Sequence, residues 1–201
     1  MNTDLLRLVQ WLSPAFPTGG YAYSHGLEWA IAQREVADAR SAGRWIGDVL
    51  RFGAGRTDAI LLAHALRGAD LLALTRALFP SAERRMESET QGAAFATAAG
   101  VDPQPLVLAF AQAARTLSVE HETVVALYLY SFAANLCSAA TRFVPLGQTE
   151  GQRILGDLHP LIGTLARDAT VASLDAIGSA AFRGDLASMQ HETLDVRIFR
   201  T

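Results

Sequence analysis

The feature that most constrains the fold is the stretch of residues 124–140, which contains no formally charged side chain. The stretch is interrupted by serine and asparagine, and it falls short of the roughly 20 apolar residues that a helix needs to cross a bilayer. A helix of this kind is typical of the centre of a helical protein, where other helices cover it. The sequence therefore predicts a buried central helix that begins near Ser118 or Val119 and ends before Pro145, and no membrane span.

The rest of the chain has the same helical character. It shows no sustained alternation of apolar and polar residues and no Asn-Gly or Asp-Gly hairpin turn. It also lacks a linker or a low-complexity segment that would separate two domains. We therefore predict an all-α protein, a single domain of about ten packed helices covering residues 1–201. The other helices are expected at residues 5–12, 24–34, 38–52, 59–67, 71–78, 81–98, from 102, from 147 and 185–191.

Several of these boundaries depend on residues that begin or end helices. Ser24 and Asp38 are expected to cap helices, and the glycines of residues 53–55 to end one. Asp102 before a proline indicates a further start, and Thr149 stands at capping-box spacing from a glutamine three residues later. A His-Pro pair at residues 159–160 is expected to break or redirect the chain.

The charged residues restrict the possible functions. All 17 basic residues are arginine, and the net charge is −3. Because no basic stripe stands out, nucleic-acid binding has no support. Because lysine is absent, a Walker-type P-loop, a Schiff-base lysine and a lysine general base are excluded. The single Cys137 excludes an internal disulfide, and the N-terminus lacks the features of a signal peptide, so we expect a cytoplasmic protein.

The sequence shows no arrangement typical of catalysis or of a metal centre. The five histidines are scattered, with no pair at the helical spacing of metal ligands, so we expect no metal and no other cofactor. There is no Gly-x-Ser-x-Gly motif, and Cys137 is interpreted as a small buried hydrophobic residue. The carboxylates Glu87 and Glu89, like Glu120 and Glu122, point in different directions on a helix and are interpreted as solvated helix faces. We therefore predict that the protein is not an enzyme.

Three segments have the character of binding surfaces. Residues 14–29 combine prolines, glycines and three aromatic residues ahead of the expected helix start at Ser24, although a loop whose aromatics fill the core would show the same composition. Arg142 stands at the expected C-terminus of the central helix, where the helix dipole alone would favour a cation. Residues 189–201 interleave apolar and basic side chains. Such a tail has apolar surface to dock, either on its own domain or on a partner.

Together these segments resemble the UreF family of urease accessory proteins. Residues 19–28 read Gly-Gly-Tyr-Ala-Tyr-Ser-His-Gly-Leu-Glu and match the family pattern Gly-x-Tyr-x-Tyr-Ser-x-Gly-Leu-Glu. Residues 128–152 are similar to the family's central helix and the turn after it, and residues 187–200 to its C-terminal motif. Weaker similarity at residues 56–67 and 89–92 fills the interval, and order and spacing agree over nearly the whole chain.

The resemblance implies a fold of packed helices, often a homodimer, in complex with the accessory protein UreD, called UreH in some organisms. It further implies recruitment of the GTPase UreG and delivery of nickel, through an internal tunnel, to apo-urease. The C-terminal motif of the family packs beside the N-terminal loop that contains Tyr21 and Tyr23, here called the tyrosine loop, when the partner binds. This pairs Arg197 with Tyr21. The partner-binding residues implied for this chain are Tyr21, Tyr23, Ser24, Glu28, Arg142, Gln148, His191, Glu192, Arg197, Phe199 and Arg200.

One departure and one alternative accompany this interpretation. Asp195 stands where the family usually has a tyrosine two residues before the arginine that aligns with Arg197, so an aromatic anchor is replaced by a charge. The alternative function is a GTPase-activating regulator that inserts an arginine in trans into the site of UreG. Arg142 and Arg153 are the candidates for that arginine.

Overall fold

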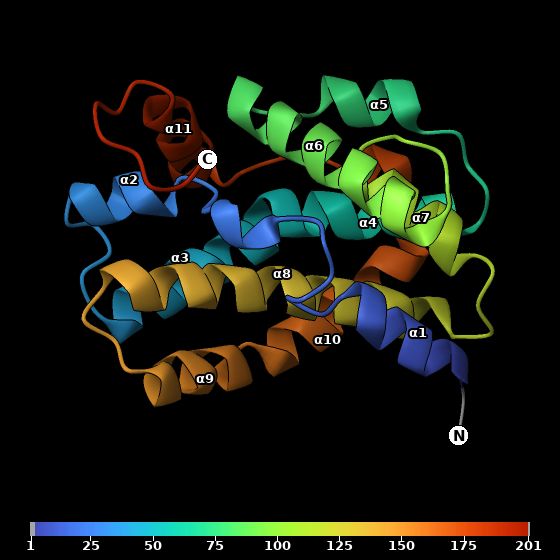
Figure 1. Ribbon diagram of the computed structural model, residues 1–201, viewed down its shortest axis with the longest axis horizontal. Helices are drawn as coiled ribbons and strands as arrows, with labels where there is room; N and C mark the ends of the chain where they lie inside the picture. The colour runs from blue at the N-terminus through green and yellow to red at the C-terminus, as the bar shows by residue number, and fades with distance from the viewer. Residues whose placement is uncertain (1–2, 201) are drawn as a thin grey trace.

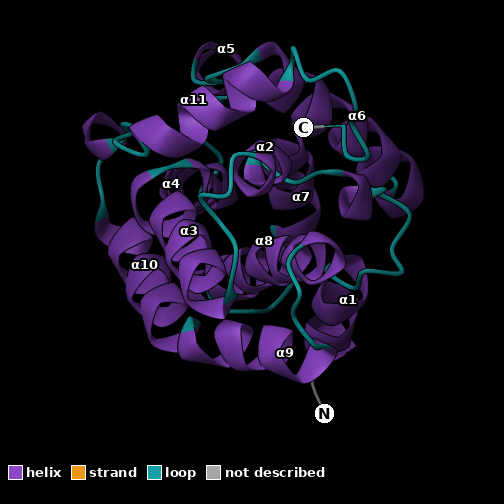
Figure 2. Ribbon diagram, turned by 90° about the vertical axis from the view of Figure 1, so that its left-hand side faces the viewer, coloured by secondary structure: helices purple, strands orange, loops and turns teal. Residues whose placement is uncertain are grey.

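The computed structural model describes residues 3–200, and its helices surround one long apolar helix (Figures 1 and 2). The all-α prediction is confirmed: 69% of the structure is helical, and residues 3–200 contain no strand. The prediction of about ten helices packed in a single domain is also confirmed. In chain order the elements are α1 (Thr3–Trp11), the 3-10 helix η1 (Gly20–Ala22), α2 (Leu27–Ala32), α3 (Ala39–Phe52), α4 (Ala54–Leu66), α5 (Leu72–Ala77), α6 (Ala82–Ala99), α7 (Leu106–Ala114), α8 (His121–Phe143), α9 (Gln148–Asp157), α10 (His159–Val171), the 3-10 helix η2 (Leu174–Ala176) and α11 (Phe182–His191).

Helix α8 is the predicted central helix. Val125, Leu129, Ala133, Leu136 and Ala140 recur every three or four residues and are all buried, so they form one continuous apolar face. The helix packs against α3, α4, α9 and α10. Within the described part of the chain it is the one helix long and apolar enough to cross a membrane by length and composition, and half of its most apolar window is buried inside the protein. Its role in the core accounts for that composition.

Several helix ends lie where the capping residues predict them. The Asp38 carboxylate accepts a hydrogen bond from the Ser41 backbone N–H at 2.7 Å, and the Ser41 hydroxyl accepts from the Asp38 N–H, which completes a capping box at the start of α3. The Ser81 hydroxyl caps α6 in the same way, through the Arg84 N–H. Gly53 ends α3, and Pro160 lies in the first turn of α10, which redirects the chain after α9.

Other predicted boundaries are wrong. α4 begins at Ala54 instead of residue 59, because the single residue Gly53 bends the chain enough to separate the two helices. The Asp102 carboxylate accepts from the side chain of Gln112 instead of capping a helix, and α7 begins only at Leu106. Thr149 lies inside the first turn of α9 and does not cap it.

Ser24 takes a different position from the one predicted. α2 begins at Leu27 with Gly26 as its N-cap, in the left-handed region at φ 74°. The Ser24 hydroxyl nevertheless accepts a hydrogen bond from the Glu28 N–H at 3.3 Å. Gly26 is required here for a second reason: a Cβ atom would lie 2.7 Å from the backbone nitrogen of Ser188 in α11. The turn before α2 is therefore shaped to receive the C-terminal helix.

A second close approach fixes α6 against the segment that leads into α7. A Cβ atom on Gly92 would lie 1.9 Å from the carbonyl oxygen of Gln104, so only glycine allows this contact. α7 in turn packs on α4, which continues the core from α8 to α6. This arrangement places the N-terminus of α6 next to α11 and brings α11 against α2 (Figure 1).

Candidate functional site

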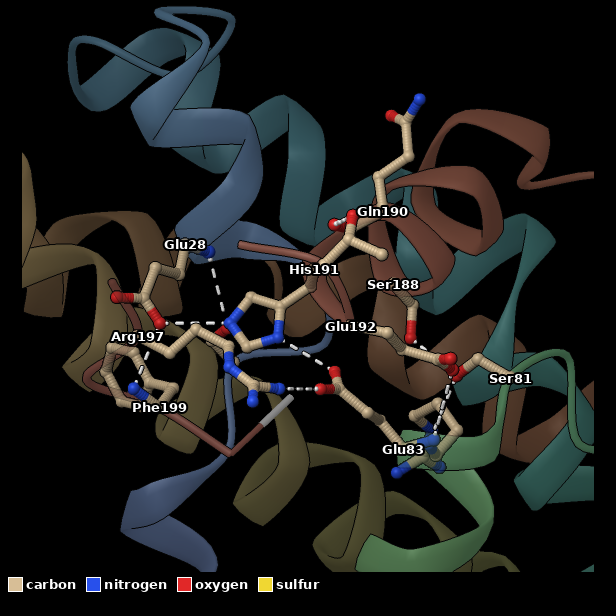
Figure 3. A network of polar contacts seen from close by, with 12 residues as sticks. Glu28, Ser81, Glu83, Ser188, Gln190, His191, Glu192, Arg197 and Phe199 are labelled. Atoms are coloured by element: carbon tan, nitrogen blue, oxygen red, sulfur yellow. Dashed lines mark hydrogen bonds and ion pairs between the residues drawn. The ribbon is translucent and has the colours of Figure 1, made fainter. Parts of the chain in front are cut away.

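The C-terminal segment folds back onto the protein, between α2 and the N-terminus of α6 (Figure 3). Its anchor is Phe199, which is 4% exposed. The Phe199 ring lies 5.1 Å from the ring of Phe143, and the Arg142 guanidinium lies 5.7 Å above it. The tail therefore docks on its own domain, one of the two possibilities that its apolar and basic pattern allowed.

His191, the last residue of α11, is the centre of the polar contacts. Its side chain is fully buried between two carboxylates from different helices (Figure 3). Nδ1 lies 2.8 Å from the Glu83 Oε2 atom, and Nε2 lies 3.0 Å from the Glu28 Oε2 atom. One imidazole thus joins α11 to α2 and α6.

Glu28 and Glu83 also hold the chain beyond His191. The Glu28 carboxylate accepts hydrogen bonds from the backbone N–H groups of Ile198 and Phe199, both at 2.9 Å. The Arg197 guanidinium donates to the Glu83 Oε1 atom at 2.8 Å. Hydrogen bonds to a charged acceptor are stronger than those between neutral groups, so these contacts fix the register of the tail.

The N-terminus of α6 provides a further contact. The Glu192 carboxylate accepts from the Ala82 N–H at 3.0 Å and from the Glu83 N–H at 3.4 Å, a position where a negative charge complements the helix dipole. The hydroxyls of Ser81 and Ser188 are 2.7 Å apart. α6 therefore receives both the end of α11 and the residue that follows it.

The tyrosine loop lies on the other side of the tail. The Arg142 Nη1 atom donates to the Tyr21 carbonyl at 3.0 Å, and the Arg200 N–H donates to the Ala22 carbonyl at 2.8 Å. The Tyr21 side chain is 64% exposed, whereas Tyr23 is buried. The side chain that reaches Tyr21 is thus that of Arg142, while Arg197 reaches Glu83.

The structure brings most of the predicted site residues together. Gln148 is the exception: it is exposed at the start of α9 and lines a different hollow, with Leu155 and Thr141. Sequence reasoning missed Glu83, Ser81 and Ser188. Glu83 gives no local signal, because its partners in α11 and the tail are more than a hundred positions away. The residues brought together are Tyr21, Tyr23, Ser24, Glu28, Arg142, His191, Glu192, Arg197, Phe199 and Arg200.

A second buried polar group was also missed, next to the loop. His25 Nε2 lies 2.9 Å from Glu87 Oε1, and Arg84 Nη1 lies 2.7 Å from the other oxygen of Glu87. The Tyr128 hydroxyl donates to Asp58 at 3.2 Å. All five residues line a cavity of about 80 Å³. The interpretation of Glu87 as part of a solvated helix face is therefore wrong, since it is buried and paired.

The ionisation of this group follows from its surroundings. Burial raises the pKa of Asp58 to about 6, against the opposing effects of Arg84 and the Tyr128 hydroxyl. Burial would also raise the pKa of Glu87, but Arg84 and His25 bring it down to about 2. Burial and Arg84 lower the pKa of His25. Neutral His25, ionised Glu87 and Arg84 thus form one compensated set.

Within residues 3–200, no group of three or more His, Cys, Asp or Glu side chains is placed to hold a metal ion. The carboxylates of Glu28 and Glu83 are occupied by donors of the tail. Cys137 is buried, and burial raises the pKa of its thiol to about 11. The arrangement is suited to holding a segment of chain in place.

Fold and site together define an all-helical protein whose C-terminal segment is held beside an N-terminal tyrosine loop by buried contacts to the carboxylates of Glu28 and Glu83. The UreF family model matches residues 36–159. Relatives named urease accessory protein UreF match over nearly the whole length of the chain. That of Cereibacter sphaeroides is 64% identical over the full length of both chains. That of Dinoroseobacter shibae is 47% identical over 98% of each, and that of Rhodopseudomonas palustris is 41% identical over all of this chain and 94% of its own. The chain therefore belongs to the UreF family of urease accessory proteins.

Proposed function

We propose that this protein is a non-enzymatic scaffold that, together with UreD/UreH, recruits the GTPase UreG and helps deliver nickel to apo-urease. The observation that carries the proposal is the docking of the tail beside the tyrosine loop, because it creates one surface from the two ends of the sequence. We call this the tail–loop surface and define it by Tyr21, Arg142, Arg197, Ile198 and Arg200.

The composition of the tail–loop surface favours protein binding. Tyr21 and Ile198 are 64% and 70% exposed although both are large and apolar in body, and three arginines lie beside them. Exposed aromatic and arginine side chains on a rigid support are the residues that dominate binding energy at protein interfaces. The buried contacts of Phe199 and His191 provide the rigid support, so little conformational entropy remains to be lost on binding.

Replacement of one exposed residue tests the proposal without disturbing the fold. Ile198→Asp should reduce co-purification with UreD/UreH at least tenfold, because a charge would enter an apolar contact. Val171→Asp is the matched control, since Val171 is 83% exposed at the end of α10 and should leave capture unchanged. Undiminished capture by the Ile198→Asp protein, with helical content intact, would refute the role of this surface.

Removal of the tail is a second test of the same role. Ending the chain at Glu192 keeps His191 and the contact of Glu192 with α6, and it should leave the helical domain folded but unable to capture UreD/UreH. Cutting at residue 189 would also remove buried His191 and is the less specific experiment. Co-purification of the shortened protein at full yield would contradict the proposal.

A substitution at Arg197 tests partner recruitment separately from the stability of the fold. Its side chain is 43% exposed and pairs with Glu83, and a partly exposed ion pair contributes roughly 0–1 kcal/mol. Arg197→Ala should therefore weaken recruitment of UreG more than it lowers the free energy of unfolding. Equal losses in both would make Arg197 a structural residue only.

For the alternative function, activation of UreG by an arginine in trans, Arg153 is the better candidate of the two arginines. Arg142 is engaged with the Tyr21 carbonyl and the Phe199 ring, whereas the Arg153 side chain is 65% exposed in its contact with Glu150. Single-turnover GTP hydrolysis by UreG distinguishes the two functions. Acceleration that disappears in Arg153→Ala would establish the alternative, and an unchanged rate supports the scaffold. A homodimer, a cytoplasmic location and the absence of nucleic-acid or membrane binding stay predictions of this proposal.

A further inference from the structure

The tail docks on two positions of one short segment of chain. The Ala22 carbonyl accepts a hydrogen bond from the Arg200 N–H at 2.8 Å. Further along the same segment, the Glu28 carboxylate accepts from two backbone N–H groups of the tail, both at 2.9 Å. The tail can meet both positions only if residues 22–28 keep one shape, because a hydrogen bond weakens steeply as its angle departs from linearity. Whatever fixes the shape of this segment therefore also fixes the tail.

His25 lies between these two positions and has an unusual backbone conformation. Its φ is 54°, in the left-handed region that residues other than glycine rarely adopt. Gly26 follows at φ 74° and lies against the backbone of Ser188 in α11. Tyr23, which is buried in the same segment, has ordinary extended backbone angles with φ −127°. A residue with a side chain stays in the left-handed region only where its surroundings hold it there.

The contacts of the His25 side chain hold it in this conformation. Only 8% of the residue is exposed. Its Nε2 atom lies 2.9 Å from Glu87 Oε1 in α6, and its ring packs at 82° against the Phe132 ring in α8, with the centroids 4.6 Å apart. Against the effect of burial, Arg84 and His25 lower the pKa of Glu87 to about 2, so the ionised carboxylate accepts and Nε2 donates. One side chain thus ties the left-handed turn to two helices of the core.

We infer that His25 is a positioning residue for tail docking: its side chain, held between Glu87 and Phe132, keeps residues 22–28 in the shape on which the tail docks. His25 acts through Ala22 and Glu28, which carry the contacts to the tail. Without the ring, the turn can leave the left-handed region, and these two acceptors lose their relative positions. The consequence for partner capture rests on the proposed function, whereas the coupling of the turn to the tail does not.

Hydrogen exchange in the isolated full-length chain tests this coupling. The amides of Ile198, Phe199 and Arg200 are all hydrogen-bonded in the docked tail, so their protection factors report tail opening. In His25→Ala their exchange should accelerate roughly tenfold or more, the effect expected for the loss of one hydrogen bond to a charged acceptor. The amide of Leu129, buried in α8, reports global unfolding in the same experiment, so opening of the tail is measured separately from unfolding of the core.

Three further variants separate the side chain from the backbone angles. His25→Gly adopts the left-handed angles without strain but has no ring, so it should lose tail protection as His25→Ala does. His25→Gln can donate its amide N–H to Glu87 and should recover most of the lost protection. Tyr128→Phe is the matched control, because it removes a hydrogen bond to Asp58 in the same cavity and leaves the contacts of His25 in place. Its tail amides should exchange at the wild-type rate.

Each result decides the inference. Faster tail exchange in His25→Ala and His25→Gly that is recovered in His25→Gln and absent from Tyr128→Phe supports it. Wild-type tail exchange in His25→Gly, a His25→Gln protein that behaves like His25→Ala, or equal acceleration in Tyr128→Phe refutes it.

A variant outside the turn covers the case in which His25→Ala does not fold. Phe132→Leu removes the aromatic contact of His25 and should accelerate tail exchange several-fold, and an unchanged rate would refute the inference. No partner is present in these measurements, so their failure leaves the scaffold function intact. Failure of partner capture, in turn, leaves the coupling of the turn to the tail intact.

Discussion

Removal of the Glu28 side chain is the most direct test of how the tail is held. Glu28 accepts hydrogen bonds from the backbone N–H groups of Ile198 and Phe199, and its Oε2 atom lies 3.0 Å from His191 Nε2. Glu28→Ala leaves two backbone N–H groups without an acceptor and His191 Nε2 without its partner. Each buried donor left unpaired costs roughly 1–3 kcal/mol, so the two amides alone account for about 2–6 kcal/mol against the docked state.

The decrease in the free energy of unfolding is limited, because the tail can detach while the rest of the protein stays folded. If the tail detaches, water satisfies its amides, and the free energy of unfolding falls by no more than the docking free energy of the tail. The helical domain should therefore remain folded while the tail equilibrium shifts. A value of about 4 kcal/mol, within the range above, corresponds to a shift of roughly 10³-fold.

The Arg200 amide is the best reporter for this shift. It donates to the Ala22 carbonyl and not to Glu28, so it loses protection only if the tail detaches as a unit. Exchange at Arg200 should accelerate by two to four orders of magnitude in Glu28→Ala, with far-ultraviolet circular dichroism nearly unchanged. Glu150→Ala, which removes an exposed ion pair with Arg153, is the control and should have no effect. Unchanged protection at Arg200 would refute the claim that Glu28 holds the tail.

Three further predictions concern the body of the protein. Gly92→Ala should lower the free energy of unfolding by about 3 kcal/mol or more, measured in urea, because its Cβ would meet a backbone carbonyl at 1.9 Å; Gly163→Ala, with open space around it in α10, should be neutral or stabilising by up to about 1 kcal/mol. Asp58 has a folded pKa of about 6, above the roughly 3.9 of an unfolded chain. As the pH rises, Asp58 therefore ionises in the unfolded chain before it does in the folded protein, and the free energy of unfolding falls between about pH 4 and 6. The difference in free energy of unfolding between Asp58→Asn and wild type should therefore shift in favour of the variant by up to about 3 kcal/mol across that range. A difference that does not change with pH would contradict this. The Cys137 thiol, with its pKa raised to about 11 by burial, should resist alkylation at pH 8 until urea unfolds the protein, and rapid labelling of the folded protein would contradict its burial.

The fold could be predicted largely from local signals. The uncharged stretch that became α8, the capping residue Asp38 and the break at Gly53 each act within one or two turns of helix, so the sequence shows them directly. The start at Asp102 failed because the Gln112 side chain, which lies beyond the first turn of α7, donates to its carboxylate. A side-chain contact of this kind has no signature at the position itself.

In the candidate site, too, the features with a local sequence signal could be predicted and the side-chain contacts could not. The tyrosine loop and the tail were visible as unusual segments, and both contribute to the site. Glu83 and Glu87 were not, because a glutamate on a helix is usually solvated, and the spacing of Glu87 from Arg84, three positions earlier, is equally typical of an exposed helix pair. Their roles depend on His191 and His25, which arrive from other parts of the chain.

The bond between Glu28 and Phe199 closes a loop of 171 positions. Contacts so distant in sequence form late in folding, because the chain between them must be ordered first. α2 and α6 must already be in place before the tail finds both of its carboxylates. If the proposed function holds, a partner that binds only the closed loop would select chains in which α2, α6 and the tail are already in place.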